Sequence, residues 1–167
     1  MDFGFVKDCV LAAVKLGSGR GGVFRYKTRV HKILFLLAQE FEELRDLRGD
    51  FIPHHFGPWS YEVELAVRAL VRLGFLEEKL EEHSEIDGLP HAAYAYAYRL
   101  TRAGRALAGP AVKRLSPKIK KKMKELLKLD LWTLIGYVKH PEYASRSVFA
   151  DVELVPKAAE LRRLREP

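Results

Sequence analysis

The sequence has one cysteine, Cys9, no asparagine, and one glutamine, Gln39. A single cysteine excludes a disulfide bond within the chain. Cys9 lies on an apolar helical stripe, which indicates a packed thiol rather than a nucleophile. Few heat-labile amides beside many Arg, Lys and Glu residues are typical of hyperthermophilic proteins.

Long apolar runs are also absent. No stretch approaches the roughly 18 residues that a membrane span needs, and the first residues do not follow the pattern of a signal peptide. We therefore expect a cytoplasmic protein with no membrane partner. A chain of 167 residues suits one domain with a sizeable core and an added helical segment.

The basic charge of the chain is concentrated in one segment. The whole chain has a net charge of +7. Residues 113–128 contain eight basic residues and one acid, Glu125, so eight minus one gives +7 for this segment alone. The rest of the chain is therefore neutral in sum. The eight basic residues are Lys113, Arg114, Lys118, Lys120, Lys121, Lys122, Lys124 and Lys128.

A helix predicted over residues 62–73 organises the centre of the chain. Gly57 and Pro58 interrupt the preceding segment, Ser60 is a favourable N-cap, and Gly74 ends the helix. Its apolar residues fall on one face and its charged residues on the other. The apolar residues are Val63, Ala66, Val67, Leu70 and Leu73, and the charged ones are Glu62, Glu64, Arg68 and Arg72.

A β-hairpin is predicted after this helix. Its first strand opens at Phe75 and Leu76, its second covers residues 93–100, and Thr101 can cap the next helix. This order is the second half of a winged helix, with residues 62–73 as its recognition helix. We predict a mainly α fold with a small β-hairpin. It is a winged helix-turn-helix domain over residues 1–110, with a C-terminal helical extension, residues 111–167, packed on it.

The segment His55–Ser60, after the apolar helix Lys32–Leu37, resembles the aromatic-Gly-Pro-aromatic-Ser turn of YwgA-like archaeal and bacterial winged-helix proteins. Panacea (SocA-like antitoxin) domains are more distantly similar. The endings Leu70–Leu76 and Tyr98–Gly104 are also similar to these families, as are Tyr137 and the segment Pro141–Ser147. The resemblance implies a winged-helix fold and no particular reaction. The Panacea domains imply a protein partner.

Further helices are predicted over residues 3–16, 27–44, 130–138 and 156–165, and a glycine-rich linker over residues 17–22. Another helix begins at Ser116 and Pro117, which suit its N-cap and first position. Its apolar stripe is Leu115, Ile119, Met123, Leu126 and Leu127, and Lys118, Lys121, Lys124 and Lys128 occupy the opposite face.

The segment 77–90 is predicted to form the wing. Phosphate contacts supply much of the affinity for DNA, so a wing that contacts DNA normally carries Lys or Arg. This wing has Lys79 alone against six acids, which argues against a conventional repressor. The acids are Glu77, Glu78, Glu81, Glu82, Glu85 and Asp87.

Three tyrosines, Tyr94, Tyr96 and Tyr98, share one face of the second strand of the hairpin with Leu100. They could stack on bases, but we favour packing on the core with the hydroxyl groups at its edge.

Catalytic and metal-binding patterns are not found. His54 and His55 are adjacent on an extended segment and point to opposite sides, so they cannot chelate one ion together. Tyr143, Ser145 and Ser147 form no triad with a positioned His and Asp. We expect no enzyme, no metal site and no cofactor.

Two functions from different classes remain. The first is a nucleic-acid-binding protein, a transcription-type regulator with DNA favoured over RNA. Residues 113–128 would contact phosphates, with Arg25, Lys27, Arg68 and Arg72 as further contacts. The second is a protein-interaction module that docks through the acidic wing or through Trp59 and Tyr61. Trp59 is either a buried staple under its helix or an exposed anchor, and we favour the staple. A homodimer is left open.

Overall fold

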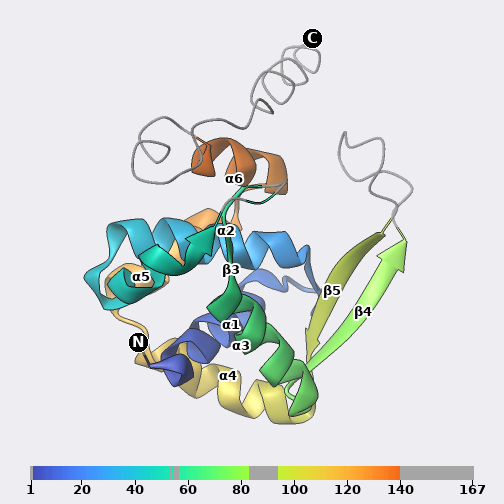
Figure 1. Cartoon of the computed structure of the whole chain (residues 1–167). Helices are drawn as coiled ribbons and strands as arrows, with labels where there is room; N and C mark the ends of the chain where they lie inside the picture. The colour runs from blue at the N-terminus through green and yellow to red at the C-terminus, as the bar shows by residue number, and fades with distance from the viewer. Residues whose placement is uncertain (1, 53, 55–56, 83–93, 140–167) are drawn as a thin grey trace.

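The computed structural model describes residues 2–52, 54, 57–82 and 94–139 of the chain. These residues form a mainly helical fold with a small antiparallel sheet (Figure 1). The predicted helix 156–165, residues 140–147 and most of the predicted wing lie outside the described residues. In chain order the elements are α1 (Phe3–Gly17), β1 (Phe24–Arg25), α2 (Lys27–Glu40), η1 (Glu42–Asp50), β2 (Phe51–Ile52), β3 (Trp59–Ser60), α3 (Tyr61–Arg72), β4 (Leu76–Glu82), β5 (Tyr94–Leu100), α4 (Arg102–Arg114), α5 (Pro117–Leu127) and α6 (Leu131–Val138).

Helices α1 and α2 form the centre of the core. Helix α1 packs against α3, α4 and α5, and α2 packs against α5 and α6. Every residue of α2 from Val30 to Ala38 is buried, because other elements surround this helix on all sides. Cys9 is fully buried in α1, and burial raises the pKa of its thiol to about 12. The prediction of a packed cysteine is confirmed.

The three-stranded sheet has the order β1-β5-β4, with both neighbouring pairs antiparallel. The central strand β5 pairs along its whole length with β4, from Leu76 opposite Leu100 to Glu82 opposite Tyr94. The short strand β1 joins the other edge, where Phe24 lies opposite Tyr98. Strands β2 and β3 form a separate pair just before α3.

The predicted caps are confirmed. The hydroxyl groups of Ser60, Thr101 and Ser116 accept backbone N–H groups in the first turns of α3, α4 and α5. Gly104 allows a close approach of α4 to the hairpin, because a Cβ there would lie 1.9 Å from the carbonyl oxygen of Phe75. The Thr-x-x-Gly motif thus combines a cap with a packing contact.

The predicted helix 27–44 is wrong at its end. Helix α2 ends at Glu40, Phe41 is extended (φ −114°, ψ 130°), and a 3-10 helix follows. Partly buried Phe41 and the buried Leu44 and Leu47 are spaced by three residues. A 3-10 helix has three residues per turn, so this spacing places all three on one face.

Three further side-chain predictions need correction. Leu73 is 60% exposed because it follows the last turn of α3, whereas Glu64 is buried although we predicted a solvated position. On β5, Tyr98 is buried but Tyr96 is 39% exposed, so the tyrosine face reaches the core only at one end. Of the six acids predicted in the wing, the four that the structure describes lie on strand β4.

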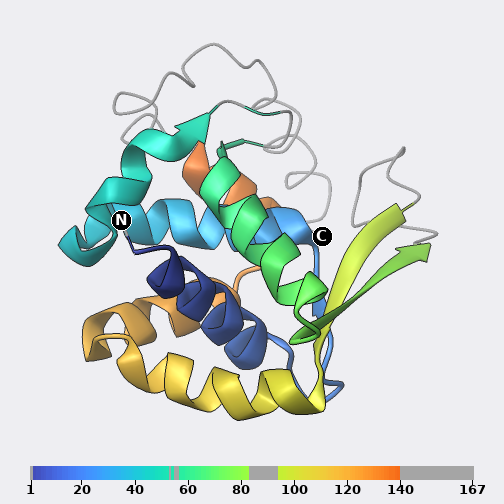
Figure 2. The same cartoon turned by 60° about the horizontal axis from the view of Figure 1, so that its bottom comes forward.

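The C-terminal helices are continuous with the rest of the molecule. Helix α4 includes Pro110 and continues to Arg114, so the predicted boundary between residues 110 and 111 falls within a helix. Helix α5 then packs on α1 and α2, and α6 packs on α2 (Figure 2). Among the described residues, no helix combines the length and the apolar character needed to cross a membrane.

Candidate nucleic-acid interface

The predicted apolar stripe of α5 lies against the core, and its lysines point outward. Leu115, Ile119, Met123 and Leu126 are buried, and Leu127 is partly buried. The four lysines predicted on the opposite face are all exposed: Lys118, Lys121, Lys124 and Lys128. The hydrophobic periodicity therefore placed both faces of α5 correctly.

Three polar contacts fix the α4–α5 segment to the central helices. Arg29 of α2 donates to the carbonyl oxygens of Leu127 and Leu129, the latter at 2.7 Å, and so caps the C-terminal end of α5. Nζ of Lys122 lies 2.8 Å from a carboxylate oxygen of Glu40. The third contact is a pair of hydrogen bonds, each 2.6 Å, from Arg114 to Asp8. Together these contacts hold α5 as a rigid platform.

Six of the eight predicted basic residues in this segment have no acidic partner among the residues that the structure describes. Arg114 and Lys122 are used in the ion pairs above, so their charges serve the fold. Within the described parts of the chain, the other six form no ion pair, and five of them are exposed; Lys120 is partly buried. The six are Lys113, Lys118, Lys120, Lys121, Lys124 and Lys128. We call them the lysine face.

The predicted basic residues near α3 differ from the lysine face, because most of them form ion pairs. Nε of Arg25 lies 3.0 Å from Glu81, and Nζ of Lys27 lies 3.0 Å from Glu64. Nε of Arg68 lies 2.9 Å from the same Glu64 oxygen. Three of the four cations predicted here are thus paired with acids of their own chain. Only Arg72, which is exposed, has no ion pair among the described residues.

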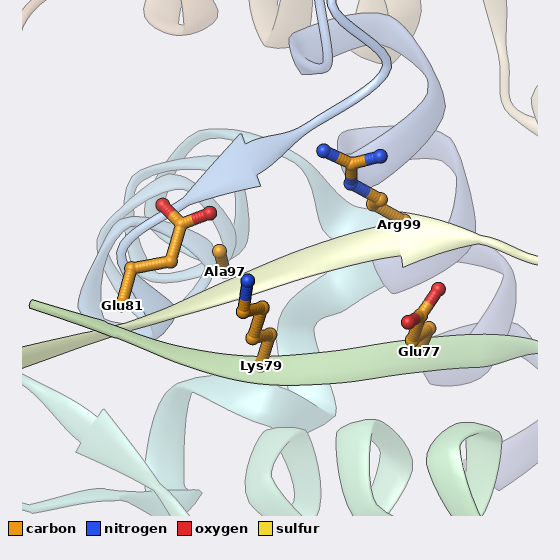
Figure 3. Close-up of a pocket in the computed structure, with 5 residues that line it drawn as sticks. All are labelled: Glu77, Lys79, Glu81, Ala97 and Arg99. Atoms are coloured by element: carbon orange, nitrogen blue, oxygen red, sulfur yellow. The ribbon is translucent and has the colours of Figure 1, made fainter.

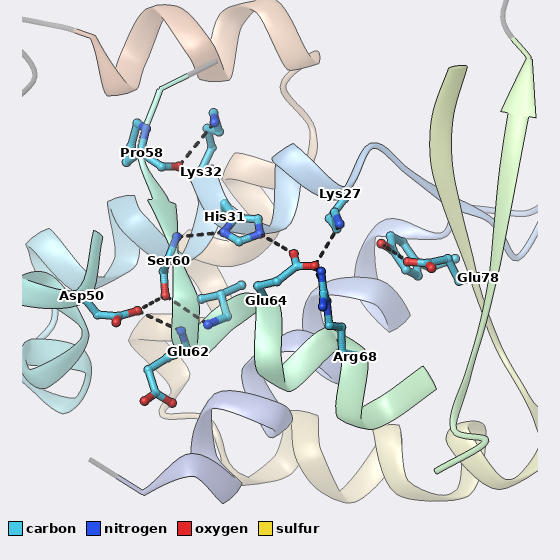
Figure 4. A network of polar contacts seen from close by, with 12 residues as sticks. Lys27, His31, Lys32, Asp50, Pro58, Ser60, Glu62, Glu64, Arg68 and Glu78 are labelled. Carbon is cyan, nitrogen blue, oxygen red and sulfur yellow. Dashed lines mark hydrogen bonds and ion pairs between the residues drawn. The ribbon is translucent and has the colours of Figure 1, made fainter. Parts of the chain in front are cut away.

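Glu64 is the centre of a buried polar network (Figure 4). His31 accepts the backbone N–H of Ser60 at Nδ1, so its proton is on Nε2, 3.6 Å from the second Glu64 oxygen. His31, Lys27 and Arg68 together lower the pKa of Glu64 to about 2, although burial opposes them. Burial lowers the pKa of His31, which is therefore neutral at pH 7.

A second carboxylate fixes the start of α3. Asp50, at the end of η1, accepts the hydroxyl group of Ser60 and the backbone N–H of Glu62, the latter at 3.0 Å. The side chain of Glu62 points away from this cluster (Figure 4). The direction of α3 is thus set by Asp50, His31 and the N-cap together.

Lys32 is buried without a carboxylate partner among the described residues. It is 1% exposed, and its Nζ donates to the carbonyl oxygen of Pro58 at 3.4 Å. Burial, with the nearby charge of Lys139, lowers the pKa of Lys32 to about 7. Gly57 (φ 98°) makes room here, since a Cβ would lie 3.1 Å from Val138.

Trp59 is partly buried, so it is neither the fully buried staple nor the fully exposed anchor of the two predictions. Its ring stacks on His31, with centroids 5.6 Å apart, and meets Tyr61 edge-on at 5.0 Å. His54 stacks at 6.1 Å. Tyr61 is 63% exposed. Trp59 therefore packs on the polar network while supporting an exposed tyrosine.

The outer face of the hairpin is a shallow, charged surface (Figure 3). Glu77 lies opposite Arg99 in the strand register, and Lys79 lies opposite Ala97. On the other face, Tyr98 donates to Glu78 at 2.7 Å. The positive and negative side chains alternate, so this surface has no excess of cations for phosphate binding.

Comparison with known proteins assigns no function. No protein-family model matches the chain, and no curated protein shows significant similarity to it. The resemblance to YwgA-like proteins therefore stays a prediction. No group of three or more His, Cys, Asp or Glu side chains suited to a metal ion occurs among residues 2–52, 54, 57–82 and 94–139.

Proposed function

We propose that this chain is a cytoplasmic nucleic-acid-binding protein of winged-helix type that contacts phosphates through the lysine face of α4 and α5. Duplex DNA is the favoured ligand, and transcription regulation is the proposed role. The observation that carries the proposal is the set of six lysines that lack acidic partners among the described residues, on two consecutive helices fixed to the core.

The order of elements supports the winged-helix part of the proposal. Helix α1, strand β1, helices α2 and α3, and the β4–β5 hairpin follow in this order, and β1 pairs with β5. A winged helix has the same order of elements, and α3 occupies the position of its recognition helix. The extra pair β2–β3 lies between α2 and α3.

The distribution of charge favours α5 over α3 as the phosphate-binding element. Near α3, Arg25 already pairs with Glu81, and Lys27 and Arg68 share the carboxylate of Glu64. A phosphate would have to compete with these carboxylates. The lysine face has no ion-paired carboxylate among the described residues, so its ammonium groups can displace the counterions condensed on DNA phosphates.

The second candidate function is a protein-interaction module. Exposed Tyr61 and the neutralised surroundings of α3 favour it, because a recognition helix that enters DNA normally presents free cations. The acidic hairpin would then attract a basic protein partner. The two functions use different surfaces and can be tested separately.

A salt titration with duplex DNA tests the first function. Replacing Lys118, Lys121, Lys124 and Lys128 by Gln should leave the circular dichroism spectrum unchanged, because all four are exposed. Each lost phosphate contact lowers the slope of log K against log salt by roughly 0.9 on B-DNA, so loss of four lowers it by about 3.6.

A charge-matched control separates the site from net charge. Replacing four exposed basic residues of the hairpin and early α4 by Gln removes the same charge, and should leave the slope unchanged: Lys79, Arg99, Arg102 and Arg105. Equal effects of both variants would show that only net charge matters. If the control variant lowered the slope more than the lysine-face variant, the DNA-binding surface would lie on the hairpin and early α4 instead.

A further inference from the structure

The exposed face of α3 is a continuous stripe with an apolar N-terminal half and a basic C-terminal half. Tyr61, Leu65, Arg68 and Arg72 follow at spacings of four, three and four residues, so they share one side of the helix. Tyr61 is 63% and Leu65 48% exposed, and the Arg68 side chain is 72% exposed. Figure 2 shows α3 on the front of the molecule.

The apolar area continues beyond the N-terminal end of the helix. Ile52 is 47% exposed and lies opposite Trp59 in the β2–β3 pair, beside Tyr61. Leu73 is 60% exposed at the other end. Exposed apolar patches of this kind mark interaction sites more often than scattered single residues do.

The charges on this stripe are self-complementary. Glu62 flanks its N-terminal end and forms no ion pair among the described residues, while Arg72 stands without one at its C-terminal end. If two α3 helices pack antiparallel, each Glu62 comes near the Arg72 of the other copy, and each Tyr61 ring faces an arginine. Leu65 lies near the middle, and exposed Leu73 of each copy meets the Trp59 end of its partner.

We infer that α3 is the dimerisation surface of this protein, and that its occupant is the α3 helix of a second copy, packed antiparallel across a twofold axis. A twofold interface uses the same patch on both copies, which requires a patch complementary to itself. The α3 stripe meets this requirement. Asp50, through the backbone N–H of Glu62, and Lys27, through Glu64, anchor the first two turns of α3 for this contact.

Sedimentation equilibrium over micromolar to submillimolar concentrations tests the inference. Wild-type protein should reach the dimer mass. Arg72→Glu and Glu62→Arg should each weaken the dimer about tenfold, because each places like charges together at two symmetric positions. The double variant should restore wild-type affinity, since it exchanges the two charges. A purely structural effect on α3 would give no such rescue.

Cross-linking provides a second measurement. Cys9 is fully buried, so Leu65→Cys would supply the accessible thiol of the chain. Leu65→Cys should form an intermolecular disulfide on mild oxidation. Leu107→Cys, on the exposed side of α4, should not.

The opposite results overturn the inference. A wild-type protein that stays monomeric at all concentrations, or single charge variants that dimerise like the wild type, would show that α3 does not pair with itself. Equal cross-linking of Leu65→Cys and Leu107→Cys would show that the disulfides form in random encounters between molecules rather than in a specific dimer. If Leu65→Arg lost duplex DNA binding while its sedimentation mass stayed that of the wild type, α3 would be a nucleic-acid-binding surface instead.

Discussion

At the scale of single residues, the unusual feature is a lysine inside the core. Lys32 is fully buried, and its pKa is lowered to about 7. In the unfolded chain, the pKa of lysine is about 10.4. Between these values the unfolded chain binds one more proton than the folded chain. The free energy of unfolding therefore rises as the pH increases from about 7 to about 10.

We expect Lys32→Met to raise the free energy of unfolding at pH 7 by about 1–4 kcal/mol, because it removes a buried charge and leaves no charged partner unpaired among the described residues. The one hydrogen bond that it removes is the long contact, 3.4 Å, to the carbonyl oxygen of Pro58. The variant should also lose the rise in stability between neutral pH and about pH 10. Urea unfolding at a series of pH values measures both effects.

The exposed Lys15 of α1 provides the control for this change. Lys15→Met removes the same charge from the surface and should leave both the stability and its pH dependence near those of the wild type. A Lys32→Met protein that is less stable than the wild type at pH 7 would show that the ammonium group is stabilised where it lies.

The caps at Ser60, Thr101 and Ser116 were predictable because capping depends on a few neighbouring residues. The burial of His31, Lys32 and Glu64 was not, because it depends on elements distant in the sequence. One signal was available: Ile33–Ala38 is apolar on every side of the helix, which indicates a helix enclosed by others. Polar residues in such a helix enter the core with it.

At the scale of elements, the predictions failed where two structures share one pattern. Spacing of apolar residues by three or four fits an α-helix, and the run Phe41, Leu44, Leu47 fits this as well as it fits a 3-10 helix. The solvated position predicted for Glu64 was wrong for a different reason. Its charge indicated a solvated face, but His31 and Lys27 of α2 provide partners that only the packing of α2 on α3 supplies.

The acids of the hairpin test which element binds nucleic acid. We expect neutralisation of Glu82, Glu85 and Asp87, by Gln or Asn, to change DNA affinity less than about twofold at physiological salt. Charges further away than about 8 Å are largely screened there. Glu81 is kept, because its carboxylate pairs with Arg25.

Fluorescence anisotropy at low and at physiological salt makes this measurement. If the hairpin instead lay against the DNA backbone, removal of three negative charges would tighten binding, and more at low salt than at high. Such tightening would place the DNA at α3 and the hairpin and would contradict binding through α5.

At the scale of the whole molecule, the two proposed surfaces are carried by different elements. In both views α5 begins on the left and the β4–β5 hairpin projects to the right (Figures 1 and 2). Helix α3 packs on α1 and on β4, whereas α5 packs on α1 and α2. A dimer formed through α3 would therefore leave both lysine faces free.

A dimer with two free lysine faces should bridge two DNA duplexes. Mixing the wild-type protein with duplexes labelled by a donor and an acceptor dye should give energy transfer, which rises with protein concentration and then falls when each duplex has its own dimer. Arg72→Glu should still bind single duplexes through its lysine face but should not bridge them. The double variant Glu62→Arg with Arg72→Glu should bridge again, because its dimer is restored. Bridging by a protein that sedimentation shows to be monomeric would require a second DNA-binding surface on one chain, and α3 would then be that surface.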